Sequence, residues 1–129
     1  MQAIFAANID ALDSMLKWIR HALLSLHVTN EHLNSIELAC EEALINIIQY
    51  SYPHVPGNIT LSCVRQGSSL IVTLVDHGLQ HNPLESVQFP THTPRIGGYG
   101  IFIMLRLMDR VNYRYVNGCN ELTLVKDHV

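Results

Sequence analysis

Glycine and proline are absent from the first 52 residues of this 129-residue chain. All seven glycines and all five prolines lie at position 53 or later. Because these two residues are the strongest breakers of regular structure, the first part of the chain is free to form long, uninterrupted elements. The second part has to alternate short elements with turns. The length is typical of one domain, and we expect a single domain over residues 1–129.

Apolar residues in the first part recur at helical spacing. The pattern predicts a short strand over residues 2–7 and a helix over residues 9–27, which Asn8 or Asp10 can cap. A second helix, which Thr29 can cap, is predicted to run to about residue 50. One face of this second helix is a continuous apolar stripe that we expect to pack on a sheet, and it consists of Leu33, Ile36, Cys40, Ala43, Leu44 and Ile47.

The second part of the chain reads as two hairpins separated by a loop and a helix. The hairpin strands are expected at residues 58–64 with 70–75, and at residues 111–116 with 121–126. The loop, residues 76–96, is too long for a passive connection, and a helix entered through glycines is expected over residues 97–109. This order of elements predicts an α/β two-layer sandwich, in which three helices cover one face of a mainly antiparallel mixed sheet.

Composition excludes several classes of protein. Hydrophobic residues make up 48% of the chain and charged residues 15%, which is typical of a folded core and not of disorder. The net charge of −3, with only two lysines, argues against nucleic-acid binding. The longest apolar run, residues 101–105, is far too short to span a membrane, and the N-terminus lacks a signal-peptide pattern. We therefore expect a cytoplasmic location.

The three cysteines, Cys40, Cys63 and Cys119, are odd in number and lie far apart inside apolar patterns. This arrangement favours reduced, buried thiols over a disulfide or a redox pair. The eight histidines show no HExxH spacing, and no CxxC motif accompanies them, so no zinc site is predicted.

Glu42 and Asn46 are the first candidates for chemistry. At about 100° per residue they lie about 40° apart on one flank of the apolar stripe, whereas Glu41 falls on the opposite flank. An Asn46 amide oxygen suits Mg²⁺, which prefers oxygen ligands, and a Glu42 carboxylate suits a general base. On this spacing alone, two ordinary solvated residues are the simpler interpretation.

Asp76 is the second candidate, because it ends a buried apolar strand and precedes His77 and Gly78. An acidic residue at such a position is costly unless it has a partner, and a purine amino group is one donor that would serve. The alternative interpretation is a turn-forming Asp-x-Gly.

A glycine-rich segment is the third candidate, since Gly97, Gly98, Tyr99 and Gly100 lead directly into an apolar helix. Glycines at a helix entrance let backbone N–H groups approach an anion, and the helix dipole favours phosphate there. A hinge before a helix is the alternative. Arg95, just upstream, can reach a terminal phosphate with its forked donors.

The order of these three sites resembles that of the GHKL, or Bergerat-fold, ATPases. Glu42-Ala-Leu-Ile-Asn46 is similar to their N box, Asp76-His-Gly78 to their G1 box, and Gly98-Tyr-Gly100 to their G2 box. The chain most resembles the bacterial anti-sigma-factor serine-protein kinases, over essentially its whole length. This similarity is strongest at residues 36–52, 97–109 and 118–126.

The resemblance implies a role for each candidate residue. ATP would bind between the helices and the sheet, under a lid that corresponds to residues 81–96. Glu42 would act as the base toward a serine hydroxyl on a partner protein, and Asn46 would hold Mg²⁺. Asp76 would accept a hydrogen bond from the adenine amino group. The remaining nucleotide-binding residues would be Gly78, Arg95, Gly97, Gly98, Tyr99 and Gly100.

The activity that the resemblance implies is transfer of the ATP γ-phosphoryl group to a serine of a small STAS-type antagonist protein. The same protein would sequester a sigma factor in a partner-switching pathway. A homodimer is also implied, and an exposed Trp18 would support it, with core packing of Trp18 as the alternative. No nucleic-acid or membrane partner is expected.

Two departures from the family pattern favour an alternative function. Gln80 replaces the second glycine of Asp-x-Gly-x-Gly, and Tyr50 stands where relatives often have histidine. The alternative is a catalytically degenerate, nucleotide-binding regulator that acts only by binding other proteins. A third interpretation, the ATP-binding half of a histidine kinase, requires phospho-acceptor helices for which these residues have no room.

Overall fold

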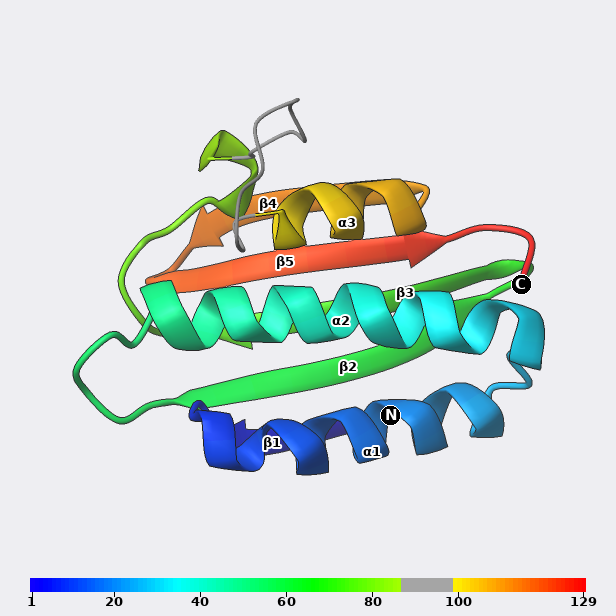
Figure 1. The fold of residues 1–129 in the computed structure, drawn as a ribbon, viewed down its shortest axis with the longest axis horizontal. Helices are drawn as coiled ribbons and strands as arrows, with labels where there is room; N and C mark the ends of the chain where they lie inside the picture. Colours follow the sequence, from blue (N-terminus) through cyan, green and yellow to red (C-terminus); the bar gives the residue numbers. More distant parts are fainter. Residues whose placement is uncertain (87–98) are drawn as a thin grey trace.

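The computed structural model describes residues 1–86 and 99–129. Within these residues the chain forms a sheet with helices on one face (Figure 1). The elements are, in order, β1 (Gln2–Ala6), α1 (Leu12–Ser25), α2 (Asn30–Tyr50), β2 (Asn58–Gln66), β3 (Ser69–Asp76), α3 (Gly100–Leu107), β4 (Arg110–Val116) and β5 (Cys119–Lys126). Short 3-10 helices occur at Ile9–Ala11 and Pro83–Ser86.

The five described strands lie in the order β1-β2-β3-β5-β4. Each neighbouring pair is antiparallel, so the prediction of a two-layer sandwich with a mainly antiparallel sheet is confirmed, and none of the described pairings is parallel. Both hairpins turn where the sequence has glycine, with φ of 60° at Gly67 and 76° at Gly118. Asn117, with φ of 53°, gives the second turn the Asn-Gly pair that suits a tight hairpin.

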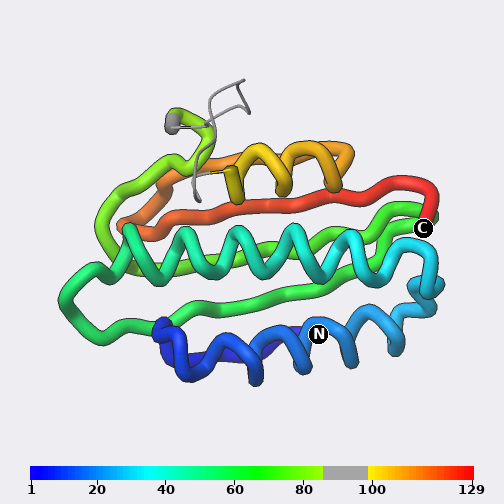
Figure 2. The backbone as a smooth tube through the Cα atoms, viewed as in Figure 1, coloured from blue at the N-terminus to red at the C-terminus, as the bar shows by residue number. Residues whose placement is uncertain are grey.

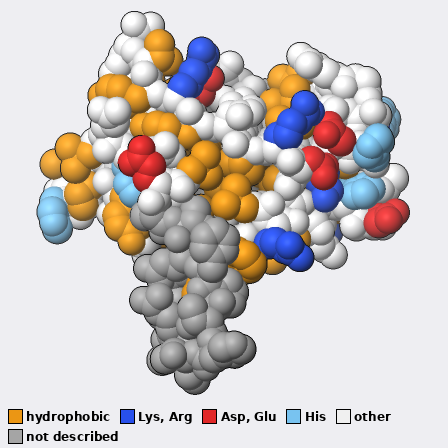
Figure 3. All heavy atoms as spheres, turned by 90° about the horizontal axis from the view of Figure 1, so that it is seen from above, with side chains coloured by type: hydrophobic (Ala, Val, Ile, Leu, Met, Phe, Trp, Pro, Cys, Tyr) orange, Lys and Arg blue, Asp and Glu red, His pale blue; other side chains and the backbone are white. Residues whose placement is uncertain are grey.

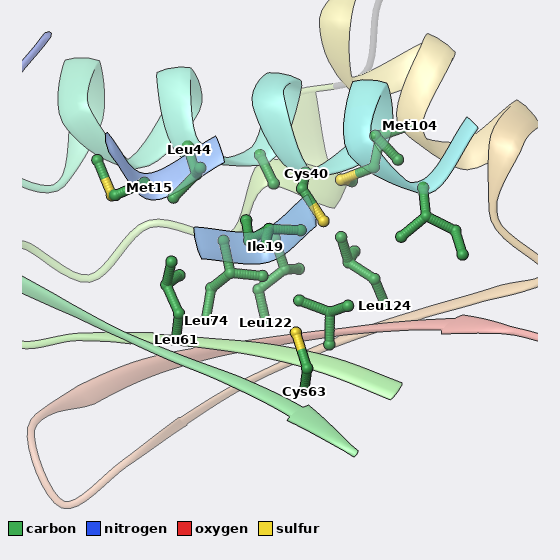
Figure 4. Close-up of a cluster of buried hydrophobic side chains, with 14 of the residues drawn as sticks. Met15, Ile19, Cys40, Leu44, Leu61, Cys63, Leu74, Met104, Leu122 and Leu124 are labelled. Atoms are coloured by element: carbon green, nitrogen blue, oxygen red, sulfur yellow. The ribbon is translucent and has the colours of Figure 1, made fainter. Parts of the chain in front are cut away.

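The core lies between the sheet and the helices. The predicted apolar stripe of α2 is buried throughout, and so are the alternate β2 residues Ile59, Leu61 and Cys63. Figure 4 shows side chains of α1, α2 and α3 meeting leucines from β2, β3 and β5. The helical period of α2 and the two-residue period of the strands therefore bury the same layer from opposite sides. This layer fixes where α2 lies over the sheet.

Helix ends differ in part from the sequence prediction. Asn8 caps the short 3-10 helix Ile9–Ala11 and not α1, since its Oδ1 accepts a hydrogen bond from the Ala11 N–H at 2.9 Å. The predicted helix over residues 9–27 is shorter, α1 begins at Leu12 without a side-chain cap, and the Thr29 side chain makes no capping bond to α2. The helix predicted over residues 97–109 ends at Leu107, because Met108 adopts an extended backbone. Asp109 then donates its N–H to the Val125 carbonyl at 2.9 Å, which ties it to the sheet.

Trp18 and the cysteines also test the sequence predictions. Trp18 is half-buried and packs edge-on against Phe5, with ring centroids 6.4 Å apart, which fits the core-packing alternative.

All three cysteines are free, as predicted. Cys40 and Cys63 are buried, but the prediction of burial was wrong for Cys119, which lies at a hairpin turn and is partly exposed.

The edges of the molecule are seen in the other views. The C-terminus lies beside the β2–β3 turn (Figure 2), where the Val129 N–H bonds to the Ser68 carbonyl. Seen from above (Figure 3), hydrophobic side chains gather in the middle of the face over the β4 and α3 edge. Tyr115 and Val116 on β4 contribute to the exposed apolar surface of the molecule.

None of the helices in the described residues is long and apolar enough to cross a membrane.

Candidate functional site

Asp76, the last residue of β3, lies at the end of the sandwich where α2 also ends and β5 begins (Figure 1). Its side chain is only 1% exposed. Three groups donate hydrogen bonds to the carboxylate: Ser51 Oγ at 3.2 Å, the Gly78 N–H at 2.9 Å and Asn120 Nδ2 at 2.8 Å. These donors offset the cost of burying the carboxylate, and the three hydrogen bonds hold the Asp76 side chain in place.

Asn120 links Asp76 to the rest of the site. Its Nδ2 also donates to the Leu79 carbonyl at 2.8 Å. Its Oδ1 accepts hydrogen bonds from the Tyr113 hydroxyl at 2.5 Å and from the His81 N–H at 3.1 Å. The sequence reasoning missed Asn120, although a signal existed. Asn120, Leu122 and Leu124 lie on the same buried face of β5, and Asn120 is the polar one of these three. A polar residue in an otherwise apolar alternation is that signal.

Gly78 is required by a close approach between two backbone segments. A Cβ added at Gly78 would lie 2.2 Å from the Ser51 carbonyl oxygen, which is a severe clash with backbone. The same carbonyl accepts a hydrogen bond from the Leu79 N–H at 2.8 Å. Gly78 therefore lets the segment after β3 pack against the end of α2. Gln80, the departure from the family pattern, is not among the described residues with positive φ, so no backbone strain arises there.

A pocket opens beside Asp76, between α2 and the ends of β3 and β5. Asn46 and Ile47 line it from α2, Asp76 and Asn120 from the strands, and His81 and Pro83 from the segment after β3. Its cavity volume is about 10 Å³, which is room for roughly one water molecule. A purine can enter only after side chains on one wall have moved.

Glu42 lies one helical turn before Asn46, against the start of α3. A Cβ added at Gly100, the first residue of α3, would lie 2.2 Å from Glu42 Oε2. The carboxylate therefore touches the backbone at the positive end of a helix dipole, a place that also attracts phosphate. Burial raises the pKa of the Glu42 carboxyl above its usual value of 4.5, and the charge of Glu41 adds to the effect.

The structure brings some of the predicted site residues together. Asn46 and Asp76 line one pocket, while Glu42 and Gly100 are in contact beside it. Tyr99 precedes α3 as its N-cap residue and makes no capping side-chain bond. Three predicted residues, Arg95, Gly97 and Gly98, lie outside the described residues. Most of the predicted lid, residues 87–96, lies outside them as well.

The comparisons with known proteins fit this geometry. The family model of the histidine kinase-like ATPase domain matches residues 5–126. The chain therefore belongs to the histidine kinase-like ATPase domain family, and this membership implies an ATP site. No curated protein matches the sequence.

Solved structures with the same fold have distant sequences. The RsbU and RsbW domains of Rv1364c from Mycobacterium tuberculosis match with a TM-score of 0.68 at 16% identity, over 98% of this chain and 32% of that chain. The histidine kinase domain of a blue-light activated kinase from Erythrobacter litoralis EL346 matches with a TM-score of 0.59 at 17% identity, over 91% and 61%. Acinetobacter baumannii histidine kinase AdeS matches with a TM-score of 0.56 at 13% identity, over 99% and 68%.

Proposed function

We propose that this chain is an ATP-dependent serine-protein kinase and an anti-sigma factor. In this proposal it phosphorylates a serine of a small STAS-type antagonist protein and sequesters a sigma factor while the antagonist is phosphorylated. The observation that carries the proposal is a line of groups that runs along α2 to the end of β3. A carboxylate at Glu42, a carboxamide at Asn46 and the buried Asp76 follow one another from the start of α3 to the pocket.

Each group suits one task in phosphoryl transfer, which enzymes catalyse mainly by positioning and charge stabilisation. Asp76 accepts hydrogen bonds and is held rigidly, so it suits the adenine amino group. The N-terminus of α3 suits the phosphates. Glu42 suits the base, because it lies beside that N-terminus. In the transfer step the serine hydroxyl gives its proton to Glu42, its oxygen bonds the γ-phosphorus, and the bond from that phosphorus to ADP breaks.

The residues present also fit a magnesium ion. Asn46 offers a hard amide oxygen at the pocket, and among the described residues no cluster of three or more His, Cys, Asp or Glu side chains could hold a metal. Mg²⁺ at nucleotide sites takes most of its ligands from phosphate and water, so one or two protein oxygens are enough to hold it. When bound, the ion would neutralise charge on the phosphates. Asn46 would hold it one turn from Glu42.

Phosphate transfer to a purified antagonist tests the proposal. The chain would be incubated with radiolabelled ATP, Mg²⁺ and candidate STAS-domain proteins, and phosphoamino-acid analysis would identify the modified residue. Phosphoserine on the antagonist is the expected product. Capture of partners with and without ATP, read by mass spectrometry, would then identify the sigma factor. Absence of transfer to every antagonist that the chain captures would contradict the kinase assignment.

One observation favours the alternative, a regulator that acts only by binding proteins. The pocket beside Asp76 has a cavity volume of about 10 Å³, and the Tyr50 and His81 rings stack beside it. A pocket this small would position a nucleotide poorly for transfer. Phosphate transfer from ATP to a purified antagonist separates the two functions, since a catalytically degenerate regulator would bind nucleotide and partners but would transfer no phosphate.

A further inference from the structure

His81 occupies a defined position at the pocket, although no local pattern of residues singles it out. Its ring stacks on Tyr50 at the end of α2, with centroids 4.8 Å apart and planes 24° apart. Its backbone N–H donates to Asn120 Oδ1 at 3.1 Å, and Asn120 in turn donates to Asp76. The imidazole is therefore placed from two sides, by a ring on α2 and by the polar network of Asp76.

One atom of this ring has no hydrogen-bond partner among the residues that the structure describes. His81 Nε2 is buried, and the described residues offer it no hydrogen bond. Buried polar atoms in proteins are nearly always paired, so an unpaired one calls for a partner such as water or a ligand. His81 lines the same pocket as Asp76, where the free space is about that of one water molecule. The residue that carries the unpaired nitrogen and the residue that carries the buried carboxylate thus line one cavity.

We propose that His81 is a base-contacting residue that determines the preference of this pocket for adenine. The proposal rests on the ATP binding proposed above. An ionised Asp76 only accepts hydrogen bonds, whereas an imidazole Nε2–H donates one. Adenine presents an amino donor next to ring nitrogens that accept, so its edge matches this pair. Guanine presents a carbonyl oxygen at the corresponding position, which an acceptor carboxylate repels.

Binding requires the pocket to widen, and the structure indicates which wall moves. Asn46 and Ile47 belong to α2, and Asp76 and Asn120 belong to paired strands, so these walls are held by regular hydrogen bonding. His81 lies outside regular structure, in the segment between β3 and the short helix Pro83–Ser86. Tyr50, behind the ring, is half exposed at 51%. The His81 wall is therefore the one that can shift outward by the thickness of a base while its ring still faces the pocket.

The substitution His81→Phe tests the proposal, because it keeps an aromatic ring against Tyr50 and removes the nitrogen. Affinity of the full chain for ATP and for inorganic triphosphate would be measured by calorimetry. We expect ATP to bind about 3–10-fold more weakly to the variant, the size of one neutral hydrogen bond, and triphosphate to bind unchanged. His21→Phe is the matched control, since it makes the same change at an exposed histidine of α1 that does not line the pocket, and it should bind both ligands as the wild type does.

The ligand can be varied instead of the protein, which removes any dependence on folding of the variant. On the wild-type chain, 1-deaza-ATP and 7-deaza-ATP each lack one ring nitrogen beside the amino group. We expect one of the two to bind about 3–10-fold more weakly than ATP, and His81→Phe to abolish that difference.

Several outcomes would overturn the assignment of His81. Equal ATP affinity of the wild type and His81→Phe, or equal affinity of the wild type for ATP and both deaza analogues, would show that the nitrogen is unused. Tighter ATP binding by His81→Phe would show that the imidazole obstructs the pocket. Equal weakening for ATP and triphosphate would show a purely structural role. A wild-type chain that binds no ATP would overturn the proposed function as well, whereas the other outcomes leave that function intact.

Discussion

The candidate site has one end proposed to bind the nucleobase, called the base end, and one proposed to bind the phosphates, called the phosphate end. The two ends are built in different ways. At the base end, Asp76 is fully buried and accepts three hydrogen bonds from Ser51, Gly78 and Asn120. At the phosphate end, Glu42 is half-buried against Gly100, and among the described residues nothing donates a hydrogen bond to its carboxylate. The base end is fixed by the fold itself. The Glu42 carboxylate at the phosphate end is not fixed in this way.

This difference follows from what each end has to do. A group that recognises a nucleobase gains from being held in one position, because less freedom is lost on binding. A general base, which takes a proton from the substrate, has to remain accessible. Strong hydrogen bonds to its charged form would weaken it as a proton acceptor. If the site works as proposed, substitutions at the base end should change stability and affinity, and those at the phosphate end should change the rate.

The largest effect is expected for Glu42→Gln. We expect phosphate transfer to fall about 10²–10⁴-fold, which is the usual contribution of a positioned general base. Nucleotide affinity should change little, because the amide keeps the shape of the side chain. The rate would be measured with radiolabelled ATP under single-turnover conditions, so that chemistry and not product release is followed.

Glu41→Gln is the matched control for this prediction. It makes the same chemical change one residue away, on the opposite flank of α2 by helical geometry. Its rate at neutral pH should stay within about twofold of wild type, since it contacts neither reacting group. Equal losses for Glu41→Gln and Glu42→Gln would contradict a specific role of Glu42.

The next largest effect is expected for Gly78→Ala at the base end. The new Cβ would meet the Ser51 carbonyl oxygen at 2.2 Å, and a backbone atom at the end of a packed helix cannot move aside easily. We expect a loss of about 2–3 kcal/mol in the free energy of unfolding, typical of overpacking. Urea denaturation would measure it.

Gly100→Ala sharpens the comparison, because its Cβ would also meet an atom at 2.2 Å, but that atom is Glu42 Oε2. A carboxylate at the end of a flexible side chain can rotate away at small cost. We therefore expect Gly100→Ala to keep nearly all of the stability and to lose much of the transfer rate. A loss of stability as large as that of Gly78→Ala would show that the phosphate end is as rigid as the base end.

The sequence predicted the fold well for a physical reason. The apolar stripe of α2 and the alternation of β2 have strong periods, and Gly67 and Gly118 mark the hairpin turns. These signals are local, so a single sequence contains them. The end of α3 was predicted two residues too late, because Asp109 is drawn away by its hydrogen bond to β5, which is a tertiary contact.

The candidate site was predicted only in part. Glu42 and Asn46 share a flank that helical geometry alone defines, and Asp76 stands out as an acid at the end of an apolar strand. Asn120, Tyr113 and the stack of His81 on Tyr50 were missed. These residues meet only when β5 pairs with β3, and no local spacing encodes that meeting.

Tyr113→Phe is expected to have a smaller effect at the base end. It removes the hydroxyl that donates to Asn120 Oδ1, while the His81 N–H still bonds the same oxygen. Because Asn120 keeps a partner, we expect a loss of only about 0.5–1.5 kcal/mol in stability. Thermal unfolding would measure it. A cost above that of Gly78→Ala would mean that the Tyr113 hydroxyl holds the whole network together.

The smallest expected effect is a shift in the pH profile of transfer at the phosphate end. Burial raises the pKa of Glu42, and the Glu41 charge raises it further. In the proposed transfer Glu42 acts as a base only when ionised, so the rate should fall as the pH drops through this raised pKa, and the acid limb should lie above the usual 4.5. Removing the charge with Glu41→Gln should move the acid limb to lower pH, with little change in the rate on the plateau.

The raised pKa of Glu42 also affects how the free energy of unfolding depends on pH. When folding raises the pKa of a carboxyl group, the protonated group adds to the free energy of unfolding. This contribution is lost as the pH rises through the pKa of the folded state. Glu42→Gln should therefore cost no stability at neutral pH, even though it removes the base. A variant that loses both transfer and stability would mean that the Glu42 carboxylate supports the fold, as Asp76 does at the other end.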